Sequence, residues 1–208
     1  SDWTEKAVNM YKKNFPDAQI LVSTWKNENI KHISCDVVQL EPPKQTQPFQ
    51  STVNHQIVGT LERLKKMNSE IIMKCRTDQY INNKDIFKIY ERSCSKNKIM
   101  IPNFITFENV EYWASDLCQI GSKKTLLDYW NSIKHFDGTF LPQVEIFLTA
   151  NYILRGKKDY APWKEIISKY FCIKDFVNDY QIEWRKMTPD WNIKRFFDLH
   201  YKNCKKAD

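Results

Sequence analysis

The chain has 208 residues, a length that fits one α/β domain with a sizeable buried core. Its apolar fraction of 42% and its charged fraction of 27% are ordinary for a folded soluble protein. With four glycines, and without a P-loop or a G-x-G-x-x-G pattern, the sequence argues against nucleotide hydrolases and simple dehydrogenases. The formal charge of +7 suits nucleic acid, an anionic membrane or a phosphorylated small molecule, so charge alone names no partner.

Cysteine spacing and hydropathy indicate the compartment. The six cysteines are scattered and include no C-x-x-C pair, so we expect reduced thiols and no structural zinc. The sequence has no signal-peptide pattern and no apolar stretch long enough to span a bilayer. We therefore expect a cytoplasmic protein without stable membrane insertion.

The first half of the chain predicts strands that alternate with helices. The short apolar runs that favour buried strands are 18–25, 35–40, 70–75 and 98–101. Ser51 or Thr52 is expected to cap a helix with apolar residues at i, i+4 and i+7. A further helix is predicted over 85–92. This alternation predicts a mostly parallel sheet that is covered by helices on both faces.

The second half is predicted to be richer in helix. Ser122 is expected to cap one helix. Pro142 opens another, which runs through Leu154 and is ended by Gly156. Pro162 suits the first turn of a third helix, and the aromatic and basic segment that follows is expected to be helical or irregular.

Arg76 and Asp78 follow the strand that is predicted over 70–75. Ligands of open α/β sheets bind at the carboxyl ends of the strands, and a carboxylate there is costly unless it is paired or bound to a cation. Residues two apart on an extended chain point to the same side. An anion binder and a cation binder would then share one strand end, which suits a diphosphate with its divalent metal. The alternative is that Asp78 is a turn former or a helix cap.

Four segments resemble the WavE-like bacterial polysaccharide glycosyltransferases. Residues 54–58 carry the N-x-Q-I-V pattern of that family, and residues 74–78 carry its K-x-R-[ST]-D pattern. Residues 115–123 look like its S-D-…-G-x-K stretch, and residues 142–145 are similar to its P-E-x-x helix start, although two residues separate Pro and Glu here. The chain also looks like the small glycosyltransferase domain with which large chlorella viruses glycosylate their capsid protein.

The resemblance implies a GT-A-like, Rossmann-related fold and the activity of a hexosyltransferase. The sequence has no internal repeat, low-complexity tract or interdomain linker, so we expect residues 1–208 to form a single domain, with a donor-binding half over 1–95 and an acceptor-side half over 96–208. The donor would be a nucleoside diphosphate sugar, most naturally a UDP-sugar. The acceptor would be a hydroxyl of a glycan or glycoprotein, with a viral capsid protein in the host cytoplasm as one candidate. No nucleic-acid partner is expected.

The resemblance also implies Mn²⁺ or Mg²⁺ at Asp78, which makes this residue a predicted metal ligand and catalytic residue. A divalent cation and the Arg76 guanidinium would stabilise the charge that develops on the leaving diphosphate. The sequence departs from the usual D-x-D motif, because Arg76 stands where the first Asp is expected. Donor phosphates and water would then supply most of the metal ligands.

Further candidate donor ligands could equally have a purely structural role. Trp25 is predicted to stack on the uracil ring while Ser23 and Thr24 bond its edge, or else Trp25 is a core residue. Asn54 is a predicted donor ligand or a helix cap.

Asp116 and Glu145 are the candidate bases on the acceptor side, with Asp116 slightly favoured. Their alternative is that of helix-terminal charges. The histidines show no H-x-x-x-H spacing, and His200 is kept as a low-ranking metal ligand.

Two other functions stay open. A sugar-phosphate nucleotidyltransferase would need a G-x-G-T-R-like loop after the first strand, and residues 22–26 lack one. A basic nucleic-acid-binding domain would need exposed aromatic residues between clustered basic ones. The aromatic residues here, such as Trp163 and Tyr170, fall at the spacing of a helix core instead.

Overall fold

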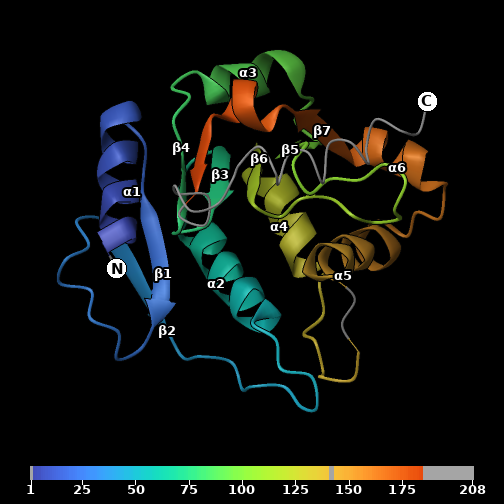
Figure 1. Ribbon diagram of the computed structural model, residues 1–208, viewed down its shortest axis with the longest axis horizontal. Helices are drawn as coiled ribbons and strands as arrows, with labels where there is room; N and C mark the ends of the chain where they lie inside the picture. The colour runs from blue at the N-terminus through green and yellow to red at the C-terminus, as the bar shows by residue number, and fades with distance from the viewer. Residues whose placement is uncertain (1, 141–142, 185–208) are drawn as a thin grey trace, which may run out of the picture.

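The computed structural model describes residues 2–140 and 143–184, and Figure 1 shows how their helices and strands are arranged. The helical elements are α1 (Asp2–Asn14), α2 (Val53–Lys66), α3 (Ile86–Ser93), α4 (Lys123–Asn131), α5 (Val144–Ala150), the π-helix η1 (Asn151–Lys157), α6 (Trp163–Tyr170) and the π-helix η2 (Phe176–Tyr180). The strands are β1 (Leu21–Trp25), β2 (Asp36–Leu40), β3 (Ile71–Cys75), β4 (Gln79–Ile81), β5 (Ile99–Pro102), β6 (Cys118–Ser122), β7 (Phe171–Lys174) and β8 (Ile182–Trp184). The four predicted strands are therefore confirmed as β1, β2, β3 and β5.

The strands of the described residues form three sheets, and this corrects the prediction of a mostly parallel sheet. Strands β1 and β2 form a parallel pair, and β4 and β8 form an antiparallel pair. The third sheet has the order β3-β6-β5-β7. In it β6 runs antiparallel to both β3 and β5, while β5 and β7 are parallel. The fold is thus mixed α/β with partly parallel sheets, because β6 enters the sheet in the opposite direction between two predicted strands.

Helices cover both faces of the four-stranded sheet, as predicted. Alternation along β5 shows why: Ile99 and Ile101 belong to one buried cluster, while Met100 belongs to the other. The first cluster lies under α2, α4, α5, η1 and α6. The second includes residues of α1, α3 and η2. A strand buried on both faces carries apolar residues at consecutive positions, which explains the short apolar run at 98–101.

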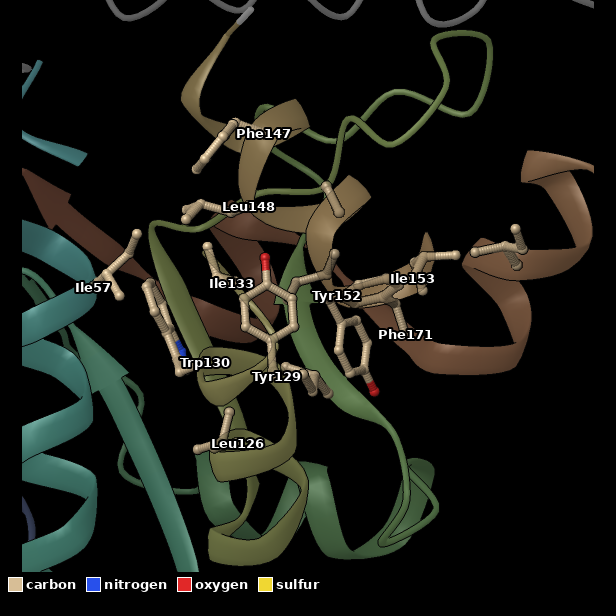
Figure 2. Close-up of a cluster of buried hydrophobic side chains, with 14 of the residues drawn as sticks. Ile57, Leu126, Tyr129, Trp130, Ile133, Phe147, Leu148, Tyr152, Ile153 and Phe171 are labelled. Atoms are coloured by element: carbon tan, nitrogen blue, oxygen red, sulfur yellow. The ribbon is translucent and has the colours of Figure 1, made fainter. Parts of the chain in front are cut away.

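The helix-rich second half is built around aromatic rings in tilted and edge-to-face contact (Figure 2). Trp130 and Tyr129 of α4 are fully buried, and the Tyr129 ring lies 4.7 Å from that of Tyr152 on η1. The indole Nε1 of Trp130 donates to Oε1 of Gln119 at 2.9 Å, so its polar edge is satisfied. Ser122 caps α4 as predicted, since its hydroxyl accepts a hydrogen bond from the Thr125 amide.

Two predictions for the second half need correction, and a third lies outside the described residues. The helix that was expected to end at Gly156 continues as η1 to Lys157, and the left-handed residue is Lys158 at φ 52°. Gly156 serves close packing instead, because a Cβ there would lie 2.6 Å from the Cβ of Ser132. Pro142 lies outside the described residues. The segment after Tyr170 was expected to be helical or irregular; it contains the π-helix η2, but it also contributes the strands β7 and β8.

Candidate functional site

Three segments meet at the carboxyl end of β3. Because β6 is antiparallel to β3, its first residue, Cys118, lies opposite Cys75, the last residue of β3. Asp116, two positions before β6, is thereby placed beside the segment that follows β3. The antiparallel pair β4–β8 brings Trp184 to the same place from the end of the described chain. The short connection between β3 and β4 contains Arg76 and Asp78.

Arg76 and Asp78 form a bidentate ion pair. Nε and Nη2 of Arg76 donate to Oδ1 and Oδ2 of Asp78 at 2.9 and 3.1 Å. The indole Nε1 of Trp184 donates to the same Oδ2 at 3.0 Å, and the guanidinium lies 6.0 Å from the centre of the Trp184 ring. Burial alone would raise the pKa of Asp78, but the hydrogen bonds from Arg76 and Trp184 hold it below its ordinary value.

Lys74 is a buried cation next to this pair. It is the next-to-last residue of β3 and is only 6% exposed, and its Nζ donates to the backbone oxygen of Asp116 at 2.5 Å. The ammonium also lies 5.1 Å from the centre of the Trp130 ring. Burial lowers the pKa of Lys74, whereas the nearby Asp116 raises it. A lysine that is this buried is rare unless its ammonium group has a partner.

Asp116 and Glu145 provide the acidic side of the site. Asp116 is 4% exposed, and its Oδ2 accepts a hydrogen bond from Nε2 of Gln56 on α2. Glu145, in the first turn of α5, is half-buried. Burial and the neighbouring Asp116 raise the pKa of Glu145, and Arg76 and Lys74 partly oppose this rise. A carboxyl group with a raised pKa is a stronger base once it is ionised.

The structure therefore brings together four of the predicted residues, and it adds a fifth. Electrostatic interactions link Arg76 to Asp78, Asp116 and Glu145, and link Lys74 to Asp116 and Arg76. We call Lys74, Arg76, Asp78, Asp116 and Glu145 the charged cluster. Two basic groups and three carboxyl groups thus face one another at the end of β3.

The predicted donor ligands on β1 lie against α2. The Trp25 ring meets the His55 ring edge-on at 4.9 Å, and the hydroxyl of Ser23 lies next to Gly59. Thr24 lies beside them on β1, paired with Gln39 of β2. Gln56 of the same helix reaches Asp116, so α2 contacts both these residues and the charged cluster.

Asn54 is not available as a donor ligand. It is 5% exposed, and its Nδ2 donates to the backbone oxygen of Phe136 at 2.9 Å. Its Oδ1 accepts from the backbone amide of Phe136 at 2.8 Å. Both ends of the amide are therefore used to hold the loop after α4 against the start of α2, which is also different from the helix-capping alternative.

The charged cluster falls inside a region that matches a known family. The model of the family described as WavE lipopolysaccharide synthesis matches residues 1–155. The chain belongs to this family. The matched region contains the whole charged cluster and Gln56, whereas Trp184 lies beyond it. The resemblance that the sequence motifs indicated is therefore confirmed for the WavE family, and the resemblance to the chlorella virus domain stays a prediction.

This WavE family member was also compared with solved structures and with curated proteins. The structure is similar to one described as "Crystal structure of HddC from Yersinia pseudotuberculosis", with a TM-score of 0.40 and 12% sequence identity. The similarity covers 74% of this chain and 84% of that chain. No curated protein matches the chain. In the described part of the chain, no helix is long and apolar enough to cross a membrane.

The residues around Asp78 do not form a preassembled metal site. Within residues 2–140 and 143–184, no three His, Cys, Asp or Glu side chains are grouped so as to hold a metal ion. Both oxygens of Asp78 already accept hydrogen bonds, and its ion-pair partner Arg76 would repel a cation. His200, the low-ranking alternative ligand, lies outside the described residues.

Three residues of this site were not predicted from the sequence: Gln56, Lys74 and Trp184. Lys74 and Gln56 lie inside the quoted motifs, and no role was given to either. A lysine within an apolar strand was the signal for Lys74, because a charge there must find a partner. Trp184 carried no local signal, since only the pairing of β4 with β8 places it at Asp78.

Proposed function

We propose that this WavE family member is a glycosyltransferase of lipopolysaccharide synthesis. It would move a sugar from a nucleoside diphosphate donor, a UDP-sugar in the first instance, to a hydroxyl of a growing glycan. The observation that carries the proposal is the charged cluster, in which two basic groups lie beside two carboxylates from the acceptor-side half. The GT-A-like fold is part of the proposal. The parallel pair β1–β2, followed by α2 and a strand that ends in the charged segment, supports it.

Lys74 and Arg76 are assigned to the leaving diphosphate. When the bond between the anomeric carbon and the diphosphate breaks, negative charge develops on the phosphate oxygens. Fixed positive groups in a water-poor setting stabilise that charge strongly, because they need no reorganisation during the reaction. Lys74 is held by the Asp116 backbone oxygen, and Arg76 by Asp78, so both cations are positioned before the donor arrives.

Glu145 is assigned as the base that accepts the proton of the acceptor hydroxyl. This reverses the slight preference for Asp116, because Asp116 is buried and bonded to Gln56 while Glu145 is half-buried and open to an acceptor. The negative charge of Asp116 helps to raise the pKa of Glu145, which improves it as a base. Asp116 would thus be a positioning residue.

The Mn²⁺ or Mg²⁺ ion that the sequence predicted at Asp78 stays a prediction. Asp78 would be its protein ligand once Arg76 turned toward the diphosphate, and the phosphates and water would complete its oxygen shell. When bound, the ion would neutralise part of the leaving-group charge. The roles of Lys74, Arg76 and Glu145 do not depend on it.

A transfer assay tests the function. The protein is incubated with radiolabelled UDP-hexoses and a lipopolysaccharide core oligosaccharide, and labelled glycan is counted. We expect transfer by the wild type and by the surface variant Lys66→Met, and loss of transfer in Lys74→Met. If no nucleoside diphosphate sugar is consumed or raises the melting temperature, the proposed function is wrong.

A further inference from the structure

A cavity of ≈ 150 Å³ lies between β1 and β3, with α1 on one side and α2 on the other. Figure 1 shows α1 and β1 at one margin of the molecule, next to α2 and β3. Its walls are mainly apolar and aromatic, with contributions from Tyr11, Phe15, Val22, Leu64 and Met73. Lys74 and Arg76 also line it, so the cavity reaches the charged cluster at the end of β3.

Two strand edges face this cavity. In the described part of the chain, β1 pairs with β2 alone and β3 pairs with β6 alone, and both β1 and β3 line the cavity. The edge of a strand that has no partner presents backbone N–H and C=O groups. Such groups are costly to leave without hydrogen bonds in an apolar setting. A flat ligand with donors and acceptors along its edge would satisfy them.

The charged residues that line the cavity are all basic: Arg63, Lys74 and Arg76. Arg63 of α2 donates from Nε to the Gly59 backbone oxygen at 3.1 Å and from Nη2 to the Thr60 hydroxyl at 3.4 Å. Among the described residues, no carboxylate forms an ion pair with it, and burial lowers its pKa. The occupant that complements these walls therefore combines an apolar, planar body with negative charge.

We propose that the cavity receives the pyrimidine base of the donor and that the diphosphate extends to Arg76. This inference rests on the proposed function and locates the donor within it. A cavity of about this volume holds a single six-membered ring such as benzene, so a pyrimidine fits where a fused purine does not. The assignment replaces the predicted stacking on Trp25, whose ring is packed against His55 and does not line the cavity.

Substitutions that fill the cavity test the proposal. Ala7 of α1 and Ser69, just before β3, are small residues on its walls. We expect Ala7→Leu and Ser69→Leu each to weaken UDP binding about tenfold or more in isothermal titration calorimetry. The matched control Glu5→Leu adds the same side chain to an exposed position of α1 and should bind UDP as the wild type does. Wild-type protein should prefer UDP to ADP by about tenfold.

The outcomes separate this proposal from the proposed function. If UDP binds and the two filling variants bind it equally well, the cavity assignment is wrong while the donor proposal stands. If the wild type binds no nucleoside diphosphate, both are wrong. Melting curves without ligand show whether Ala7→Leu has folded, and Ser69→Leu, at a half-exposed site, answers the question independently.

Photo-crosslinking with 5-iodo-UDP gives a direct readout on unmodified protein. Attachment to Tyr11, Phe15 or Met73, found by peptide mass spectrometry, supports the cavity. Attachment to Trp25 or His55 overturns it and restores the stacking prediction.

Discussion

The two edges of β3 differ sharply. On one edge β6 pairs with the full length of the strand and places Asp116 beside Lys74. On the other edge β1 lines a cavity instead of pairing. The paired edge is a rigid support, on which charged groups can be held in fixed positions. The unpaired edge has backbone groups and space to offer a ligand. The proposed chemistry belongs to the first edge and the proposed donor binding to the second.

The largest expected effect is on the paired edge. We expect Lys74→Met to lower kcat/KM for transfer about 100-fold or more, because a fixed positive charge next to the leaving diphosphate is lost. The free energy of unfolding should change little or rise, since a buried charge is replaced by an apolar chain of similar length. Steady-state kinetics and urea unfolding measure the two effects. Equal kcat/KM in Lys74→Met and in the exposed control Lys66→Met would remove Lys74 from the chemistry.

The second prediction separates transfer from donor binding. Glu145→Gln should lower kcat about 100-fold and leave the UDP affinity unchanged, because the amide cannot accept the acceptor's proton. In the wild type, kcat/KM should rise with pH through the pKa of Glu145, which lies above the ordinary glutamate value.

A matched control for this variant is Glu165→Gln, on an exposed position of α6. The rising acidic limb of the pH profile should persist in the control. If Glu145→Gln retains the wild-type kcat and the same acidic limb, the base is another group, with Asp116 as the next candidate.

The part of the site that the sequence predicts and the part that it does not can both be located on β3. The apolar run at 70–75 and the polar residues after it were sufficient to predict Arg76 and Asp78 at a strand end. Their meeting with Asp116 and Glu145 was beyond sequence reasoning. Strand β6, with the sequence C-Q-I-G-S, has neither a continuous apolar run nor clear alternation, so its antiparallel entry into the sheet left no local signal.

Two other features had no local signal for a different reason. The cavity depends on which strands fail to pair, and that is a property of the assembled sheet. Strand β8 has three residues, and it pairs with β4 across about a hundred positions of the chain. Asn54 shows the converse case: its position at a helix start was predicted correctly, but its partner, the Phe136 backbone, could not be.

The third prediction concerns the acid stability of the connection between β3 and β4, which holds Arg76 and Asp78. The pKa of Asp78 is depressed, so its ion pair stabilises the fold above its unfolded pKa of about 3.9 and this stabilisation is lost as pH falls through the folded value. Because the Arg76 side chain is 40% exposed, solvent screens the pair, and about 0.5–1 kcal/mol is expected.

Urea unfolding at neutral and acidic pH measures this effect. Asp78→Asn should be less stable than the wild type at neutral pH and should lose less stability on acidification. The exposed control Asp17→Asn should follow the wild type at both pH values. A variant Asp78→Asn that matches the wild type at neutral pH would mean that the pair adds no stability.

The smallest expected effect is that of a divalent cation. Asp78 is held by Arg76 and Trp184, so a metal must displace the guanidinium before it can bind the carboxylate. We therefore expect Mn²⁺ to strengthen UDP binding to EDTA-treated wild type by about threefold, and Asp78→Asn to lose this gain. Without metal, Asp78→Asn should bind UDP at least as tightly as the wild type, because Arg76 is released to contact the diphosphate. Calorimetric titrations of both proteins, with and without Mn²⁺, measure all four affinities. A gain of about 100-fold in the wild type that disappears in Asp78→Asn would show that Arg76 yields readily and that Asp78 is a true metal ligand.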